Sequence, residues 1–87
     1  MNTRFNARVL LVDDEVTFLG SLSRHLEEGG LKVCTPTCTK EAVEALEDQK
    51  FAAIILELAM PGFNGLEILW RIKAVQPEAE IIILNGL

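Results

Sequence analysis

The stretch A-I-I-L-E-L-A-M-P-G, residues 53–62, indicates the fold of this chain. It begins as a continuous apolar run with β-branched residues, which is typical of a strand buried on both faces of a sheet. The run ends on a carboxylate, Glu57, and a Pro-Gly turn follows. A second apolar run, R-V-L-L-V at residues 8–12, ends in the same way on Asp13 and Asp14. We therefore predict two buried strands whose carboxyl ends carry acidic side chains.

The rest of the chain alternates between helix and strand patterns. Apolar residues at three- and four-residue steps before Gly29-Gly30, and again in two later segments, predict amphipathic helices. In the third helix Leu66, Leu69 and Ile72 are expected to face the core. The expected strands are 8–12, 31–35, 51–58 and 81–84. The first expected helix carries the apolar residues Val16, Leu19, Leu22 and Leu26, and the other two span 41–49 and 66–75.

This order of elements predicts an α/β fold, with a doubly wound parallel sheet in one small domain over residues 1–87. Short connections and right-handed crossovers place helices on both faces of such a sheet. Ligands of these folds bind at the carboxyl ends of the strands. Asp13, Asp14, Glu57 and Asn85 all stand at predicted carboxyl ends, so we expect them to lie near one another.

Composition excludes several classes of function. The chain is 49% hydrophobic and 24% charged, as in globular domains, and no apolar run reaches the length of a membrane span. The net charge of −5 argues against nucleic-acid binding by this domain. No signal-peptide core stands at the N-terminus, so we expect a cytoplasmic protein without a membrane partner. The C-x3-C pair Cys34 and Cys38 is not a redox or zinc motif.

Neighbouring carboxylates repel one another, and a hard divalent cation relieves that repulsion. Mg²⁺ takes a few carboxylates, a carbonyl and waters, and often bridges to a phosphoryl oxygen. The alternative is that Asp13 or Asp14 caps the first helix and complements its dipole.

Three separated motifs give the chain a resemblance to the receiver domains of response regulators in bacterial two-component signalling. They are V-L-L-V-D-D-E at 9–15, I-I-L-E-L-A-M-P-G-F-N-G-L-E-I-L at 54–69 and I-I-I-L-N-G at 81–86. The resemblance implies a flavodoxin-like topology with strand order 2-1-3-4, the fifth βα unit being missing. It also implies a role in a phosphorelay, with a histidine kinase or phosphotransfer protein as partner.

By the same resemblance, Asp13 and Asp14 hold the acidic-pair positions and Glu57 holds the phosphoacceptor position, where the family has aspartate. The resemblance makes Asp14, Glu57 and the backbone carbonyl of Ala59 the ligands of Mg²⁺. Asn85 takes the switch position, where the family has Ser or Thr. The family's fifth strand, with its Lys, and its last helices have no counterpart.

These departures bear on function. Glutamate moves the carboxylate outward by roughly 1.5 Å, and in-line phosphoryl transfer depends on positioning at that scale. We therefore expect little or no phosphorylation of Glu57 and weak Mg²⁺ binding at best, with the Glu57 side chain pointing toward Asn85 or solvent. Glu57 either partly imitates a phosphorylated residue or is inert. Asn85 either contacts Glu57 or simply caps the end of its strand.

A fourth strand at the edge of the sheet is expected to expose apolar surface. Either the chain is part of a longer protein, or it covers this surface by self-association, for which we expect a homodimer through the fourth-strand region. Trp70 is either an interface anchor or packs flat against Arg71, Lys73 or a neighbouring helix. The function we expect is a divergent receiver acting as a protein-interaction module, not an enzyme. The alternatives are a functional receiver that binds Mg²⁺ and accepts a phosphoryl group and, remotely, a small phosphatase-like enzyme, for which Asp13 and Glu15 match poorly.

Overall fold

The computed structural model describes residues 7–84 of the 87-residue chain. Strands and helices alternate along it, as the sequence predicts, with bounds that differ by at most two residues from those expected. The elements are β1 (Arg8–Val12), α1 (Val16–Glu28), β2 (Lys32–Cys34), α2 (Thr39–Asp48), β3 (Ala53–Glu57), α3 (Gly65–Val75) and β4 (Glu80–Leu84).

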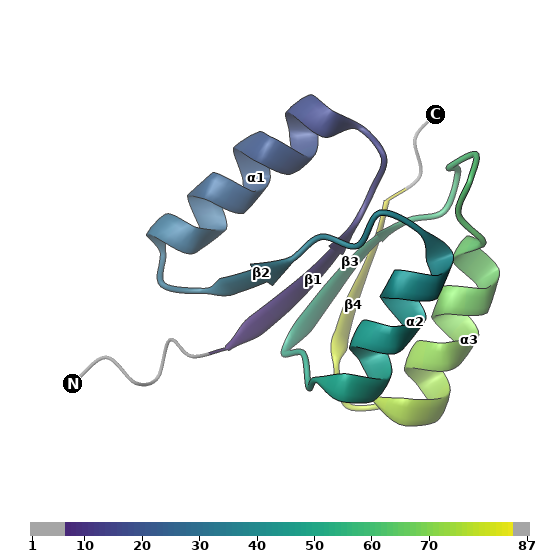
Figure 1. Cartoon of the computed structure of the whole chain (residues 1–87). Helices are drawn as coiled ribbons and strands as arrows, with labels where there is room; N and C mark the ends of the chain where they lie inside the picture. Colours follow the sequence, from purple (N-terminus) through teal and green to yellow (C-terminus); the bar gives the residue numbers. More distant parts are fainter. Residues whose placement is uncertain (1–6, 85–87) are drawn as a thin grey trace.

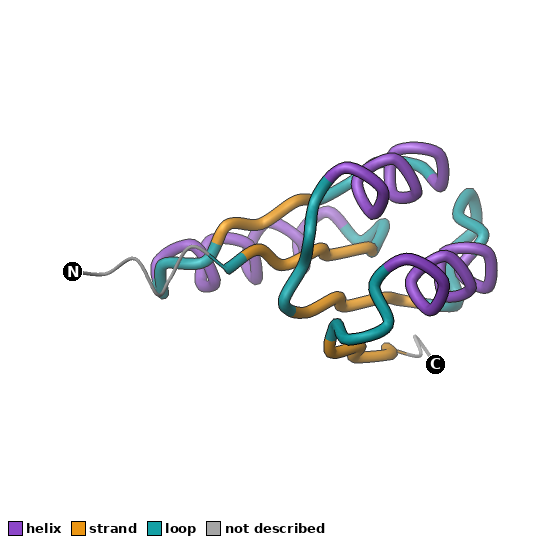
Figure 2. The backbone as a smooth tube through the Cα atoms, turned by 90° about the horizontal axis from the view of Figure 1, so that it is seen from below, coloured by secondary structure: helices purple, strands orange, loops and turns teal. Residues whose placement is uncertain are grey.

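The four described strands form one parallel sheet in the order β2-β1-β3-β4, which confirms the predicted topology. Helices α2 and α3 lie side by side over one face of the sheet. Helix α1 lies on the other side, next to β2 (Figures 1 and 2). The register pairs Val12 with Leu56 and Glu57 with Leu84. The carboxyl ends of β1, β3 and β4 therefore meet at one edge of the sheet.

The main core lies between the sheet and the pair α2 and α3. Its apolar side chains are fully or almost fully removed from water, which is the dominant stabilising contribution in a domain of this size. The buried members are Leu10, Val12, Ala42, Ala45, Leu46, Phe51, Ile54, Leu56, Met60, Ile68 and Ile72.

The third helix buries two of the three residues expected to face the core: Ile72 is fully buried, and Leu69 is partly buried and packs against the core. Leu66 is 63% exposed, whereas Gly65, Ile68 and Ile72 are buried, so the prediction that Leu66 faces the core is wrong. The reason lies at Gly65, where an added Cβ would stand only 3.1 Å from Leu58 Cδ2. This close approach of α3 to the β3–α3 connection sets the rotation of the helix about its axis.

Helix α1 is held less firmly than α2 and α3. Its residues Leu19, Leu22 and Leu26 are half-buried against the sheet, and no residue of the helix is fully buried. Val16, predicted to belong to the same apolar face, is 79% exposed. It stands in the first turn, where the helix has only begun to cross the sheet.

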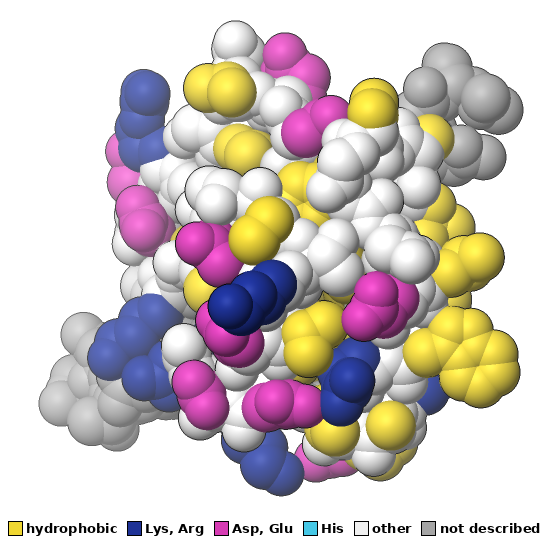
Figure 3. Space-filling model, turned by 45° about the vertical axis from the view of Figure 1, so that its right-hand side comes forward, with side chains coloured by type: hydrophobic (Ala, Val, Ile, Leu, Met, Phe, Trp, Pro, Cys, Tyr) yellow, Lys and Arg dark blue, Asp and Glu magenta, His cyan; other side chains and the backbone are white. Residues whose placement is uncertain are grey.

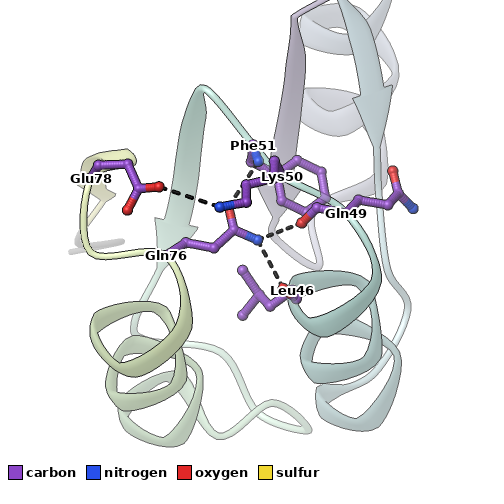
Figure 4. A network of polar contacts seen from close by, with 6 residues as sticks. All are labelled: Leu46, Gln49, Lys50, Phe51, Gln76 and Glu78. Carbon is purple, nitrogen blue, oxygen red and sulfur yellow. Dashed lines mark hydrogen bonds and ion pairs between the residues drawn. The ribbon is translucent and has the colours of Figure 1, made fainter.

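Gln76 joins α2, α3 and the start of β3 at the amino ends of the strands, opposite the carboxyl ends that carry the acidic residues. Its Oε1 accepts a hydrogen bond of 2.8 Å from the backbone N–H of Phe51, and its Nε2 donates to the carbonyls of Leu46 and Gln49 (Figure 4). The side chain is 3% exposed, so these backbone groups have little access to water. Gln76 thus fixes the ends of α2 and α3 against the start of β3.

Among residues 7–84, none of the helices combines the length and the apolar character that a passage through a lipid bilayer requires. Cys34 and Cys38 are free thiols, both half-buried.

Candidate functional site

An acidic hollow of about 460 Å³ opens at the carboxyl ends of β1, β3 and β4. Four carboxylates border it, together with one aromatic ring, one aliphatic side chain and the backbone of the β3–α3 connection. Its lining residues are Asp13, Asp14, Glu15, Phe18, Glu57, Ala59 and Leu84. The acidic residues that the sequence places at strand ends, Asp13, Asp14 and Glu57, therefore line one hollow.

Asp13 and Glu15 shape the wall contributed by the β1–α1 connection. Asp13 is 8% exposed, and its Oδ1 accepts a hydrogen bond of 3.0 Å from the backbone N–H of Glu15. The Glu15 carboxylate in turn accepts one of 2.8 Å from the N–H of Phe18, so Glu15 is the N-cap of α1. The alternative in which Asp13 or Asp14 caps the helix is thus wrong, and Asp14 is exposed.

Glu57 ends β3 with its side chain turned back over the following turn. Its Oε2 accepts a hydrogen bond of 2.9 Å from the backbone N–H of Ala59, and the residue is 8% exposed. We expected Glu57 to point toward Asn85 or solvent, and its burial contradicts the solvent alternative. Asn85 lies outside the described residues, so the Glu57–Asn85 contact stays a prediction.

The donor set of the hollow suits Mg²⁺ in chemistry. Carboxylate and carbonyl oxygens are the ligands that a hard cation prefers. Within residues 7–84, however, no three Asp, Glu, His or Cys side chains gather closely enough to hold a metal ion. One oxygen of Glu57 and one of Asp13 already accept backbone hydrogen bonds.

A separate polar cluster lies at the connection between β2 and α2. Both the backbone N–H and the hydroxyl of Thr37 donate to Glu41 Oε1, at 2.8 and 2.7 Å. These hydrogen bonds, the backbone one foremost, lower the pKa of the Glu41 carboxyl. Burial, followed by the negative charge of Glu41, raises the pKa of the Cys34 thiol. Cys34 is therefore a poor thiolate former.

The sequence interpretation missed the contributions of Phe18 and Gly65. Phe18 lies off the main apolar stripe of α1 and is 39% exposed, yet it borders the acidic hollow. Gly65 keeps the β3–α3 connection close to α3, and this connection carries Ala59. A signal for Gly65 was available, because a glycine directly after the N-cap residue Asn64 is a poor helix former and indicates a packing constraint.

Residues 9–86 match the family described as the response regulator receiver domain. The chain belongs to this family, whose members are signalling modules of two-component systems. It is also 31% identical over 79 residues to the transcriptional regulatory protein PrrA of Mycobacterium tuberculosis, an alignment that covers 91% of this chain and 34% of PrrA.

Solved structures agree with the fold. A response regulator from Burkholderia pseudomallei, which carries a phosphorylated aspartic acid and a calcium ion, superposes with a TM-score of 0.85 at 30% identity, covering 94% of this chain and 48% of that one. TrrA of Thermotoga maritima, in complex with Mg²⁺ and BeF, gives 0.79 at 32% identity, covering 93% and 70%. TrrA has also been crystallised with the histidine kinase ThkA. The chain spans about a third of the length of PrrA and about half of the Burkholderia protein.

Proposed function

We propose that this chain is a divergent receiver domain that does not take up a phosphoryl group and acts as a protein-interaction module. The observation that carries the proposal is the state of Glu57, which holds the phosphoacceptor position. Its carboxylate is buried and accepts a hydrogen bond from the N–H of Ala59. The side chain that would have to attack a phosphoryl group is thus engaged with its own backbone.

The length of the Glu57 side chain supports the proposal independently. The extra C–C bond displaces the carboxylate by roughly 1.5 Å relative to an aspartate on the same backbone. Phosphoryl transfer gains most of its rate from in-line positioning and from electrostatic stabilisation, and a displacement of this size is costly to both. The charge remains, so Glu57 imitates a phosphorylated residue in part, with less charge and fewer acceptor oxygens than a phosphoryl group.

Mg²⁺ has a reduced role in this proposal. Relatives such as TrrA bind Mg²⁺ together with a phosphoryl analogue. In this chain the expected ligands are Asp14, Glu57 and the carbonyl of Ala59, and the hydrogen bond at Glu57 competes with the metal for that carboxylate. We therefore expect binding that is weak at best.

The partners of the proposed module follow from the likeness to TrrA, which forms a complex with a histidine kinase. We propose that this chain binds a histidine kinase or a phosphotransfer protein without receiving a phosphoryl group from it. We also propose self-association through the region of β4. Ile82 and Ile83 are 49% and 42% exposed on opposite faces of this edge strand, and burying them stabilises a dimer.

Intact-mass spectrometry after incubation with acetyl phosphate and Mg²⁺ tests the central claim. The wild-type chain is expected to show no phosphoryl adduct at any time point. Glu57→Asp is the matched variant, because it keeps the charge and returns the carboxylate to the position that the family uses. An adduct on Glu57→Asp alone would assign the loss to the length of residue 57.

An adduct on the wild-type chain, removed by Glu57→Gln, would refute the proposal. It would establish the second candidate, a functional receiver, which the gathering of three carboxylates around one hollow favours. If neither the wild-type chain nor Glu57→Asp forms an adduct, the proposal is supported, and the loss of phosphorylation has a cause beyond the length of residue 57.

A further inference from the structure

The face of α3 that points away from the core carries large apolar side chains in water. Trp70 is 73% exposed and Leu66 is 63% exposed. Figure 3 shows hydrophobic side chains gathered along the right-hand edge of that view, with acidic and basic side chains beside them. We call the exposed face the α3 stripe; its members are Leu66, Glu67, Trp70, Lys73 and Ala74, all exposed.

The α3 stripe is self-complementary about Trp70. Glu67 stands three residues before Trp70 and Lys73 three residues after it, while Leu66 and Ala74 stand four residues before and after. If two copies of α3 pack antiparallel with a two-fold axis beside Trp70, Glu67 of each copy lies at the level of Lys73 of the other. The same arrangement sets Leu66 opposite Ala74 and places the two Trp70 rings together.

Neither Glu67 nor Lys73 forms an ion pair within the described part of the chain. The ion pairs found among residues 7–84 join Lys50 with Glu78 and Arg71 with Glu47, and they leave out Glu67 and Lys73. Both charges also have favourable places on the helix, because Glu67 lies in its first turn and Lys73 in its last. They are thus free to pair with a partner without loss of a contact inside the protein.

We propose that the occupant of the α3 stripe is a second copy of this chain, docked antiparallel through Trp70. The inference rests on the proposed function, since it specifies the surface through which an interaction module associates with itself. A shallow hollow of about 310 Å³, lined by Leu69, Trp70 and Lys73, receives apolar side chains of the other copy.

The surface of the proposed dimer continues from the α3 stripe onto β4. Ile83 pairs with Leu56, so it lies on the face of the sheet that α3 covers, and it is 42% exposed. An 11-residue helix is about 16 Å long, so two such helices with part of β4 form an interface at the lower end of the usual size range. A dimer that forms at micromolar concentrations is therefore expected.

Charge reversal at Glu67 and Lys73 tests the docking geometry. The wild-type chain at about 100 µM is expected to show a dimer mass in size-exclusion chromatography with light scattering. Glu67→Lys faces each Lys73 with a second lysine, and Lys73→Glu faces each Glu67 with a second glutamate. Each single variant is expected to weaken the dimer at least about 10-fold, because like charges are brought together twice.

The double variant Glu67→Lys with Lys73→Glu is expected to restore the dimer. Within one chain, both substitutions place the wrong charge at a helix end, so their effects on folding add and do not compensate. Restored dimerisation therefore reports contact between copies. Glu28→Lys is the matched control, because it makes the same charge change on the exposed end of α1 and should leave the dimer intact.

A monomeric wild-type chain at about 100 µM overturns the inference, and so does a double variant that stays as weak as the single ones. Ile82 lies on the opposite face of β4 from α3, so Ile82→Lys probes the strand edge alone. If Ile82→Lys abolishes the dimer while the reversals at Glu67 and Lys73 have no effect, the α3 stripe is refuted but self-association through β4 stands. None of these outcomes bears on phosphorylation, which the mass measurement tests separately.

Discussion

The carboxylate of Glu57 accepts a hydrogen bond of 2.9 Å from the backbone N–H of Ala59, two residues further along the chain. Glu57 thereby closes a turn with the carboxylate that we propose stands at the phosphoacceptor position. The residue shares its hollow with Asp13 and Asp14, so the carboxylate has both a favourable local partner and unfavourable charged neighbours.

Substitutions at Glu57 separate these two effects. Glu57→Ala removes the acceptor and should lower the free energy of unfolding by about 1–2 kcal/mol, because the N–H of Ala59 loses its partner. Glu57→Gln keeps an oxygen acceptor and removes one of the four negative charges that border the hollow, so we expect it to be at least as stable as the wild-type chain. Urea denaturation followed by circular dichroism measures both, and equal losses in the two variants would contradict this account.

Gly65 should be intolerant of any side chain. A Cβ at this position would lie 3.1 Å from Leu58 Cδ2 and 3.3 Å from Leu58 Cα, and the backbone atom cannot move away cheaply. Gly65→Ala is therefore expected to cost about 1–2 kcal/mol, despite the better helix propensity of alanine. Gly20→Ala in α1 is the control, since nothing lies within 4 Å of the added Cβ and a gain of about 0.5–1 kcal/mol follows. Urea midpoints that moved in the same direction would count against the packing argument.

Gln76→Ala should be among the most damaging single substitutions of a polar residue in the described chain. It removes three hydrogen bonds to backbone groups that have little access to water. A loss of about 3 kcal/mol in thermal or urea unfolding is expected. Gln49→Ala serves as control, because it deletes an exposed amide and retains the carbonyl that Gln76 contacts. A loss in Gln76→Ala no larger than in the control would show that water replaces the network.

The loss of folding stability at acid pH should depend on Glu41. Its pKa is lowered in the folded chain by the hydrogen bonds from Thr37, so its contribution is present above the usual value of 4.5 and is lost as the pH falls through the folded value. Glu41→Gln should therefore flatten the fall in the urea midpoint below pH 4.5. The wild-type and variant midpoints should converge at the lowest pH, and a constant difference from pH 6 to pH 3 would exclude the linkage.

The order and type of the elements could be predicted from the sequence because each strand is a continuous apolar run and each helix an amphipathic one. The carboxyl-end acids could be placed in one hollow because parallel strands bring their ends together. The rotation of α3 could not be predicted, because Leu66-Leu69-Ile72 and Gly65-Ile68-Ile72 are both apolar series at helical spacing. Only the contact between Gly65 and Leu58, which are not neighbours in the periodic pattern, decides between them.

The site was predictable in its residues but not in its hydrogen bonds. The pattern Asp-Asp-Glu before a helix leaves three candidates for the cap, and the choice of Glu15 depends on where β1 releases the backbone. The hydrogen bond from Ala59 to Glu57 is also local, and the sequence does not reveal it because it depends on a side-chain rotamer in a turn.

The shallow attachment of α1 has a consequence for how the hollow opens. The helix has no fully buried residue, so its detachment from the sheet exposes little apolar surface and costs a fraction of global unfolding. Glu15 and Phe18 would leave with it, and the wall that they form beside Asp13 would go too. We therefore expect sub-global fluctuations of α1 to open the acidic hollow, and amide hydrogen exchange in α1 should run ahead of that in α2 and α3.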